Sequence, residues 1–201
     1  MHVPPFAAAA IACFFFACPE SGRATDADTP SATSTESKVA LTFSGGHDTE
    51  GVDRGRPVIL VASALNVPPE VFREAFTHVK PAGPGQHPEE AQVRLNKQAL
   101  MERLGPLGVT DDRLNEVSNY YRYRRDSGEL WRHVDAQGYA TVQNGVVTGV
   151  TITNPGAGYS SLPTVSVPGV PNVFLTPMLS FGTDLPTNGS ISKITIEPKT
   201  N

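Results

Sequence analysis

The chain has 201 residues, with 16 Lys and Arg against 20 Asp and Glu, so its formal net charge is −4. Glycine and proline contribute 18 residues each, more than in an average globular chain but fewer than in a low-complexity chain. These values exclude a collagen-like or fully disordered protein, and the mild acidity gives no reason to expect a nucleic-acid partner. They indicate a turn-rich globular protein without specifying a biochemical activity.

The chain begins with an apolar segment. Residues 6–17 are only Ala, Ile, Cys and Phe, a length that suits a signal peptide and is too short to cross a bilayer. Cys18 follows the small Ala17 and precedes a polar stretch, and Phe15-Phe16-Ala17-Cys18 resembles a bacterial lipobox, with Phe where Leu is usual. We therefore predict a signal peptide over residues 1–17 and a lipid attached to Cys18. Cleavage within residues 18–25, giving a soluble secreted protein, and no export at all are the alternatives.

The remaining chain is divided by its charge. Residues 41–140 hold 26 of the 36 charged side chains, and residues 141–201 hold four. Residues 18–37 are small and polar without apolar periodicity, which is typical of a flexible linker. We predict an α+β fold, with an α+β unit over residues 38–136 and a short all-β repeat module over residues 137–201.

The charged unit begins with a strand and continues with helices. Apolar residues alternate over residues 39–44, and helical periodicity follows over residues 57–65, 68–79, 88–104 and 110–117. Thr110 is placed to cap the last of these helices. The two helix corners, at residues 64–70 and 106–112, would suit either a DNA-binding helix-turn-helix or a hydrophobic staple. We favour the staple because neither second helix is basic.

A Tyr-rich β-hairpin is predicted after these helices. Tyr120, Tyr121, Tyr123 and Trp131 flank the turn sequence Asp126-Ser127-Gly128. In one interpretation these rings and the interleaved arginines bind a ligand, because aromatic faces and guanidinium groups together stack sugars and hold anions. In the other, the rings cover the helices and the arginines face water. The residues of this candidate ligand surface are Tyr121, Tyr123, Arg122, Arg124 and Trp131.

The C-terminal module contains an internal repeat. Asn144-Gly145, between alternating apolar residues, is a strong signal for a tight hairpin. Residues 144–152 match residues 188–196 at an offset of 44 residues without a gap. Further short strands are expected at residues 164–167, 173–175 and 178–181. The module therefore contains one full β unit and the start of a second.

Two resemblances accompany this pattern. Gly156-Ala157-Gly158-Tyr159, followed by Pro163, Val165 and Val167, resembles a Gly-Tyr β-repeat of bacterial extracellular and phage tail proteins. The loop at residues 45–48, the sequence VFREAF at residues 71–76 and the sequence GELW at residues 128–131 are similar to an uncharacterised planctomycete-type family of exported proteins. The first resemblance implies an assembly or adhesion element, and the second implies no known activity.

One acidic loop could carry chemistry. His47, Asp48, Glu50 and Asp53 place one imidazole and three carboxylates within seven residues. Such groups hold divalent cations and perform acid–base catalysis, although acidic surface loops with one histidine are also common. We expect no cofactor, and the loop is only a candidate metal site.

These observations favour a non-enzymatic role. We predict an exported protein of the cell envelope, held to the membrane by a lipid, that acts as a binding or structural module. Its expected partners are the membrane, through the lipid anchor, and an envelope polysaccharide or protein. A metal-assisted hydrolase centred on the His47-Asp48-Glu50-Asp53 loop is the alternative.

Overall fold

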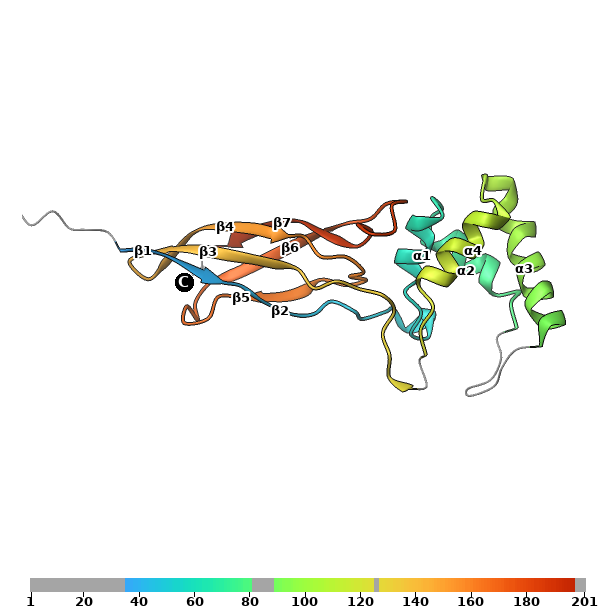
Figure 1. Ribbon diagram of the computed structural model, residues 1–201, viewed down its shortest axis with the longest axis horizontal. Coiled ribbons are helices and arrows are strands. Elements are labelled where there is room, and N and C mark those ends of the chain that lie inside the picture. The colour runs from blue at the N-terminus through green and yellow to red at the C-terminus, as the bar shows by residue number, and fades with distance from the viewer. Residues whose placement is uncertain (1–34, 81–88, 125–126, 198–201) are drawn as a thin grey trace, which may run out of the picture. The chain divides into compact units, whose positions relative to one another are not determined.

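The computed structural model describes residues 35–80, 89–124 and 127–197, all of which belong to one compact unit, Ser34–Asn201. Its helices and strands confirm the predicted α+β class (Figure 1). The helices are α1 (Val58–Ala64), α2 (Pro69–Phe76), α3 (Glu90–Leu104) and α4 (Asp111–Tyr120), with short 3₁₀ turns η1 (Gly51–Asp53) and η2 (Gly105–Leu107). The strands are β1 (Glu36–Ala40), β2 (Thr42–Gly45), β3 (Gln137–Gln143), β4 (Val146–Asn154), β5 (Pro163–Ser166), β6 (Phe174–Ser180) and β7 (Ser190–Glu197).

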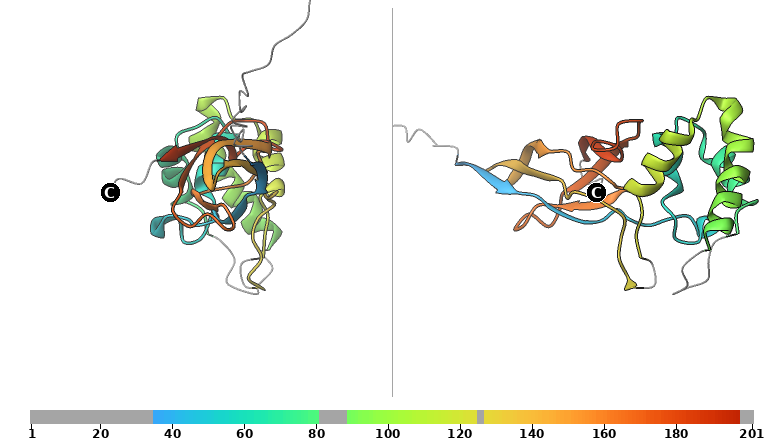
Figure 2. Two further views of the ribbon diagram at one scale, coloured as in Figure 1. Left: turned by 90° about the vertical axis from the view of Figure 1, so that its left-hand side faces the viewer. Right: turned by 45° about the vertical axis from the view of Figure 1, so that its right-hand side comes forward.

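The strands form two antiparallel sheets. One sheet has the order β1-β3-β4 and the other has the order β2-β5-β6-β7. Figure 2 (left) shows the two sheets in a view along the strands, and their inner faces share one apolar core. This core includes Ala140, Val142 and Val147 from the first sheet and Val165 and Leu175 from the second. The two sheets therefore form a small β-sandwich.

The single strand predicted at residues 39–44 is divided in two. β1 pairs with β3 in one sheet, whereas β2 pairs with β5 in the other, and Leu41 lies between them. The amide of Leu41 donates to the carbonyl of Gly138 at 3.0 Å, which holds the crossing point. Alternating residues indicate a strand but not its partner, so the sequence could not show this change of sheet. Both sheets thus cross the unit boundary predicted near residue 137.

The sequence repeat corresponds to two β-hairpins of similar construction. β4 and β7 are each the second strand of a hairpin, formed with β3 and β6. Each contains one extra residue at the same repeat position, Thr148 in β4 and Ser192 in β7. The hydroxyl of each bulged residue donates to a carbonyl of the partner strand, at 3.3 Å to Thr141 and 3.1 Å to Met178.

The predicted strands at residues 173–175 and 178–181 are joined in β6, which contains Pro177. Proline lacks an amide donor and is normally excluded from the middle of a sheet. Here β6 pairs with β5 only between Leu175 and Val165, while it pairs with β7 over seven residue pairs. Pro177 is therefore tolerated because the pairing between β5 and β6 is limited to that one residue pair and does not include Pro177.

The four predicted helices are present, close to their predicted bounds. Thr110 caps α4 as predicted, since its hydroxyl accepts the amide of Arg113 at 3.2 Å. The helices enclose a second core that includes Leu60, Phe72, Leu104 and Val117. In the part of the chain that the structure describes, no helix has the length and apolar character needed to cross a bilayer.

The prediction of a Tyr-rich hairpin around residues 126–128 is wrong. Tyr120 is the last residue of α4, and the described residues at 121–124 and 127–133 contain no strand. These residues lead away from α4 and then back toward β3 in an extended course (Figure 1; Figure 2, right). The first aromatic residues of this segment, Tyr120 and Tyr121, still follow the helical spacing of α4. Burial of the aromatic side chains against the helices overrides their preference for strands.

Candidate functional site

The helices meet the sandwich at a joint centred on Asn188, whose side chain is 1% exposed. Its Nδ2 donates to the carbonyl of Leu60 at 2.8 Å and to the hydroxyl of Tyr121 at 2.9 Å. Its Oδ1 accepts from the amide of Gly182 at 3.1 Å and lies 3.0 Å from the hydroxyl of Ser63, whose one hydrogen is also within reach of the Ile59 carbonyl at 2.7 Å. Both donor hydrogens of the amide and its oxygen are therefore used. One side chain therefore connects α1, the residue following α4 and the β6–β7 connection.

Tyr159 forms the sandwich side of the joint. Its ring is 1% exposed, and its hydroxyl accepts the amide of Ala136 at 2.8 Å. The neighbouring backbone is so close that a β-carbon at Gly46 would lie 2.5 Å from the ring, and one at Gly189 would lie 2.5 Å from the Tyr159 carbonyl. The glycines around Tyr159 thus allow close backbone packing. This gives the motif Gly156–Tyr159 a structural role at the joint.

His47, the first residue of the candidate metal loop, is part of an aromatic cluster at this joint. Its ring stacks on Tyr159 with centroids 5.3 Å apart and lies 4.5 Å from the ring of His133 and 6.0 Å from that of Trp131. Its Nε2 is buried without a hydrogen-bond partner among the described residues. Burial, followed by repulsion from His133, lowers the pKa of His47, and the carboxylate of Asp135 opposes the shift only in part. The neutral imidazole is therefore favoured.

The three carboxylates of the loop point to different partners. Asp53 is buried and forms a bidentate pair with Arg73, at 2.7 Å to Nε and 3.0 Å to Nη2. Glu50 is exposed and lies 3.2 Å from the same guanidinium. The hydrogen bond to Asp53 is the largest cause that raises the pKa of Arg73. Two of the four candidate ligands therefore share one arginine, which balances only one of their two negative charges.

Asp48 has different partners, in the loop at residues 160–161. Its amide donates to the hydroxyl of Ser161 at 3.0 Å, and its carbonyl accepts from the hydroxyl of Ser160 at 2.7 Å. Among the described residues, no three His, Cys, Asp or Glu side chains come together in a group that could hold a metal ion. The residues that the sequence placed together as a metal site thus have separate contacts.

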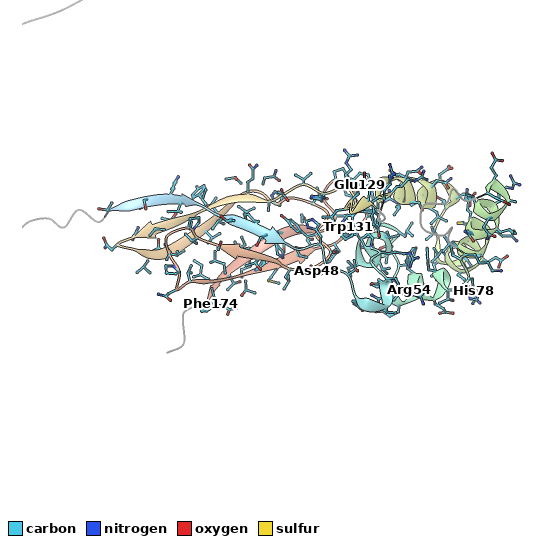
Figure 3. All side chains as sticks on the ribbon, turned by 90° about the horizontal axis from the view of Figure 1, so that it is seen from below. Asp48, Arg54, His78, Glu129, Trp131 and Phe174 are labelled. Atoms are coloured by element: carbon cyan, nitrogen blue, oxygen red, sulfur yellow. The ribbon has the colours of Figure 1, made fainter. Side chains whose placement is uncertain are left out.

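The aromatic members of the candidate ligand surface are largely structural. Tyr121 is 4% exposed, and Trp131, which Figure 3 places where the sandwich meets the helices, is 2% exposed. The indole of Trp131 donates to the Gly158 carbonyl at 2.8 Å. Burial raises the pKa of Tyr121 to about 12. Tyr123 is half-buried, and its hydroxyl donates to the carbonyl of Gly55. These rings face the core in this structure, which agrees with the interpretation that they cover the helices and not with the one in which they form an exposed ligand surface.

The two arginines of that predicted surface are exposed, but they do not converge on one point. Nη2 of Arg122 donates to the side chain of Asn119 at 2.9 Å, at the end of α4. Arg124 lies further along the loop, where its amide donates to the carboxylate of Glu129 at 3.1 Å. Repeated Tyr and Arg residues indicated a ligand surface in the sequence. The structure separates them, with the rings turned inward and the guanidinium groups outward.

A groove of about 520 Å³ lies beside the joint, and we name it the joint groove. Its walls come from the loop after β2, the start of α1, one residue of α2, the loop before β5 and the end of β6. Its apolar lining consists of Pro57, Val58, Ile59, Leu162, Leu179 and Phe181, and its polar lining consists of Asp48, Thr49, Glu50, Asp53, Arg56, Arg73, Ser160 and Ser161. A concave, largely apolar site of this volume is typical of a ligand-binding cleft.

The polar lining of the joint groove is unevenly available to a ligand. The side chains of Asp53 and Arg73 satisfy one another, and the hydroxyls of Ser160 and Ser161 hold the backbone of Asp48. The carboxylates of Asp48 and Glu50 remain exposed at the rim, whereas Leu162 is 58% exposed in the apolar wall. The groove can therefore cover an apolar group while its rim attracts a positive charge.

Sequence reasoning missed most of this site. Asn188 had the signature of a simple hairpin turn, and Arg73 was only one residue of an amphipathic helix. The walls of the groove come from segments more than 100 residues apart, which no local pattern brings together. The predicted lipid-attachment residue, Cys18, lies outside the described residues.

Comparison of the chain with protein-family models, with curated proteins and with solved structures finds no match. The resemblances to an exported planctomycete-type family and to a Gly-Tyr β-repeat therefore stay predictions.

Proposed function

We propose that the chain is an exported cell-envelope protein, attached to the membrane by a lipid on Cys18, that binds a segment of another envelope protein in the joint groove. The observation that carries the binding role is the groove itself, a concave site of about 520 Å³ with an apolar wall and two exposed carboxylates at its rim. Its role in this proposal is recognition, not catalysis.

The lining favours a polypeptide over a polysaccharide as the occupant. Sugar rings are commonly held on flat aromatic faces, and Phe181 is the one aromatic residue among the described residues that line the groove. Aliphatic side chains such as Leu162 and Ile59 instead match the apolar side chains of an extended peptide. The exposed Asp48 and Glu50 add a preference for a basic residue in that peptide. The proposed occupant is thus an extended apolar segment with at least one Lys or Arg.

The rigid joint supports this role. The Asn188 hydrogen bonds and the packing of Tyr159 fix the helices against the sandwich, and the groove walls belong to both parts. A preformed groove does not lose conformational entropy on binding as a mobile one does, so more of the contact free energy becomes affinity.

The binding proposal is tested with a labelled decapeptide that alternates valine and lysine, titrated with the full chain and followed by fluorescence anisotropy. Leu162→Asn places a neutral polar group in the apolar wall at an exposed position, so it should weaken binding by about tenfold or more while the fold persists. Val146→Asn is the matched control, because Val146 is 63% exposed on the β3–β4 hairpin and outside the groove lining.

Equal affinities of the two variants would contradict the groove assignment. A peptide that alternates valine and glutamate should bind more weakly than the lysine peptide, and the difference should shrink in Asp48→Asn/Glu50→Gln. If an envelope oligosaccharide binds and the lysine peptide does not, the occupant is a polysaccharide and the proposed partner class is wrong.

The lipid anchor is tested separately by growing producing bacteria with an alkyne-labelled fatty acid. The chain should incorporate the label and partition with membranes, and Cys18→Ser should do neither. Labelling of Cys18→Ser at the level of the unaltered chain would overturn the assignment of Cys18, without affecting the groove.

A further inference from the structure

The four strands at the edges of the two sheets differ in how well they could pair with another strand. β2 has four residues, and β1 has five. β4 is longer, but extra residues at Thr148 and Thr153 interrupt its register. Bulges of this kind twist an edge away from an incoming strand. β7 has a regular five-residue stretch from Lys193 to Glu197, opposite Met178 to Phe174 of β6.

The outer edge of this stretch has no strand hydrogen-bonded to it among the described residues. β4 contacts β7, and the amide of Ile191 at the beginning of β7 donates to the carbonyl of Pro155, which follows β4, at 2.9 Å. Lys193, Thr195 and Glu197 are exposed, whereas Ile194 and Ile196 are half-buried against the sandwich core. The open edge therefore has one polar face and one apolar face.

The charges along this edge are complementary to those on the same edge of a second copy of the chain. If a second copy pairs antiparallel with β7 about a two-fold axis at Thr195, Lys193 of each copy lies opposite Glu197 of the other. The same register places Ile194 opposite Ile196, so polar residues meet on one face and apolar residues on the other. Opposite charges at directly paired positions stabilise an antiparallel strand pair, and residues of the same face always pair.

We propose that β7 pairs with β7 of a second copy of this chain about a two-fold axis at Thr195, so that two four-stranded sheets become one eight-stranded sheet. The pairing satisfies backbone groups of both edges and forms two ion pairs between Lys193 and Glu197. Phe174 and Met178, which are 58% and 53% exposed, lie beside Glu197 and Lys193 on the same face. Figure 3 shows Phe174 on the sandwich, away from the helices and from Asp48, which lines the joint groove.

The sequence repeat supplies an internal comparison. The positions of β4 that correspond to Lys193, Thr195 and Glu197 are Gly149, Thr151 and Thr153. They have no charge, and the last of them is an extra residue outside the register. The two copies of the repeat therefore share a hairpin plan, and only the second has an edge with complementary charges.

The proposal is tested by measuring the mass of the full chain in mild detergent by sedimentation equilibrium over a wide concentration range. The unaltered chain should form dimers. Lys193→Glu or Glu197→Lys alone replaces both ion pairs with like-charge pairs, and each should raise the dissociation constant about tenfold or more. An equimolar mixture of these two variants should dimerise again, because a chain with two acidic side chains at these positions then pairs with a chain that has two basic ones.

The rescue distinguishes an ion pair between copies from a general effect on folding. Lys193→Glu/Glu197→Lys should also dimerise like the unaltered chain, and circular dichroism should show that all variants fold. Thr151→Lys on β4 is the matched control and should leave the dimer intact. A monomeric unaltered chain, a mixture that fails to recover, or loss of the dimer in Thr151→Lys would each overturn the proposal.

Discussion

The dipeptide Asn-Gly occurs once in each copy of the repeat, exposed to solvent in the first copy and buried in the second. Asn144 and Gly145 form the exposed turn between β3 and β4, and both have positive φ angles, of 50° and 79°. Asn188 and Gly189 precede β7 and are buried at the joint, where the Asn188 side chain holds α1. A turn signal in the sequence thus marks a hairpin in one copy and the contact between helices and sandwich in the other.

This difference shows how a repeated unit can acquire a second role. The first turn needs only residues that tolerate a left-handed backbone, which Asn and Gly provide. The second turn also needs a side chain with two donor hydrogens and an acceptor oxygen, and Asn provides these too. The same dipeptide therefore satisfies backbone geometry in one place and a buried hydrogen-bond network in the other.

The largest expected difference is between alanine substitutions of the two asparagines. Asn188→Ala leaves the Gly182 amide and other buried polar groups without a partner, so we expect a loss of about 3–4 kcal/mol in the free energy of unfolding. Asn144→Ala removes no buried contact and should cost about 1 kcal/mol for its left-handed backbone. Urea denaturation of both variants measures the difference, and equal losses would show that Asn188 does not hold the joint.

Alanine substitutions of Gly145 and Gly189 should also differ in the stability that they cost, in the same direction but by less. A β-carbon at Gly189 would lie 2.5 Å from the Tyr159 carbonyl and 2.6 Å from Leu60 Cδ2, whereas at Gly145 it would meet nothing within 4 Å. Both have positive φ, so Gly145→Ala should cost about 1 kcal/mol and Gly189→Ala about 3 kcal/mol. Thermal unfolding of the two variants tests this order, and a Gly145→Ala variant that unfolds first would reverse the comparison.

The smallest expected effect is a pH dependence of the folding stability that arises from His47 at the joint. Because burial and His133 lower the pKa of His47, the unfolded chain binds its proton more readily than the folded chain does. Stability should therefore fall as pH decreases below about 6.5, until His47 is also protonated in the folded state. Urea denaturation at several pH values should show a shallower decrease in His47→Phe than in the unaltered chain.

His78→Gln provides the control for this measurement, because His78 is an exposed residue beyond the end of α2. It should retain the pH dependence of the unaltered chain. An unchanged slope in His47→Phe would mean that another group causes the loss of stability at low pH.

The sequence predicted local elements well because their signals are local. The four helices, the Thr110 cap and the Asn144-Gly145 turn each depend on residues within a few positions of one another. The change of sheet at Leu41 and the burial of the Tyr-rich segment depend on partners far along the chain. Those partners are chosen by tertiary packing, which periodicity and propensity do not encode.

The candidate site was predicted less well for the same reason. The sequence placed His47, Asp48, Glu50 and Asp53 together because they are neighbours in the chain. In the structure, Arg73 forms ion pairs with two of the carboxylates, and the rings of Tyr159 and His133 pack against the imidazole. A cluster of ionisable residues is a metal site only if its neighbours leave the ligands free to converge.

The hydrogen bond from Asn188 to the Leu60 carbonyl joins residues 128 positions apart. During synthesis the helices therefore emerge long before the side chain that fixes them against the sandwich. Contacts of such sequence separation form slowly because a long loop must close before they stabilise anything. Closure of the joint is accordingly expected as a late folding step, and a chain interrupted before residue 188 would have its helices without their main polar attachment.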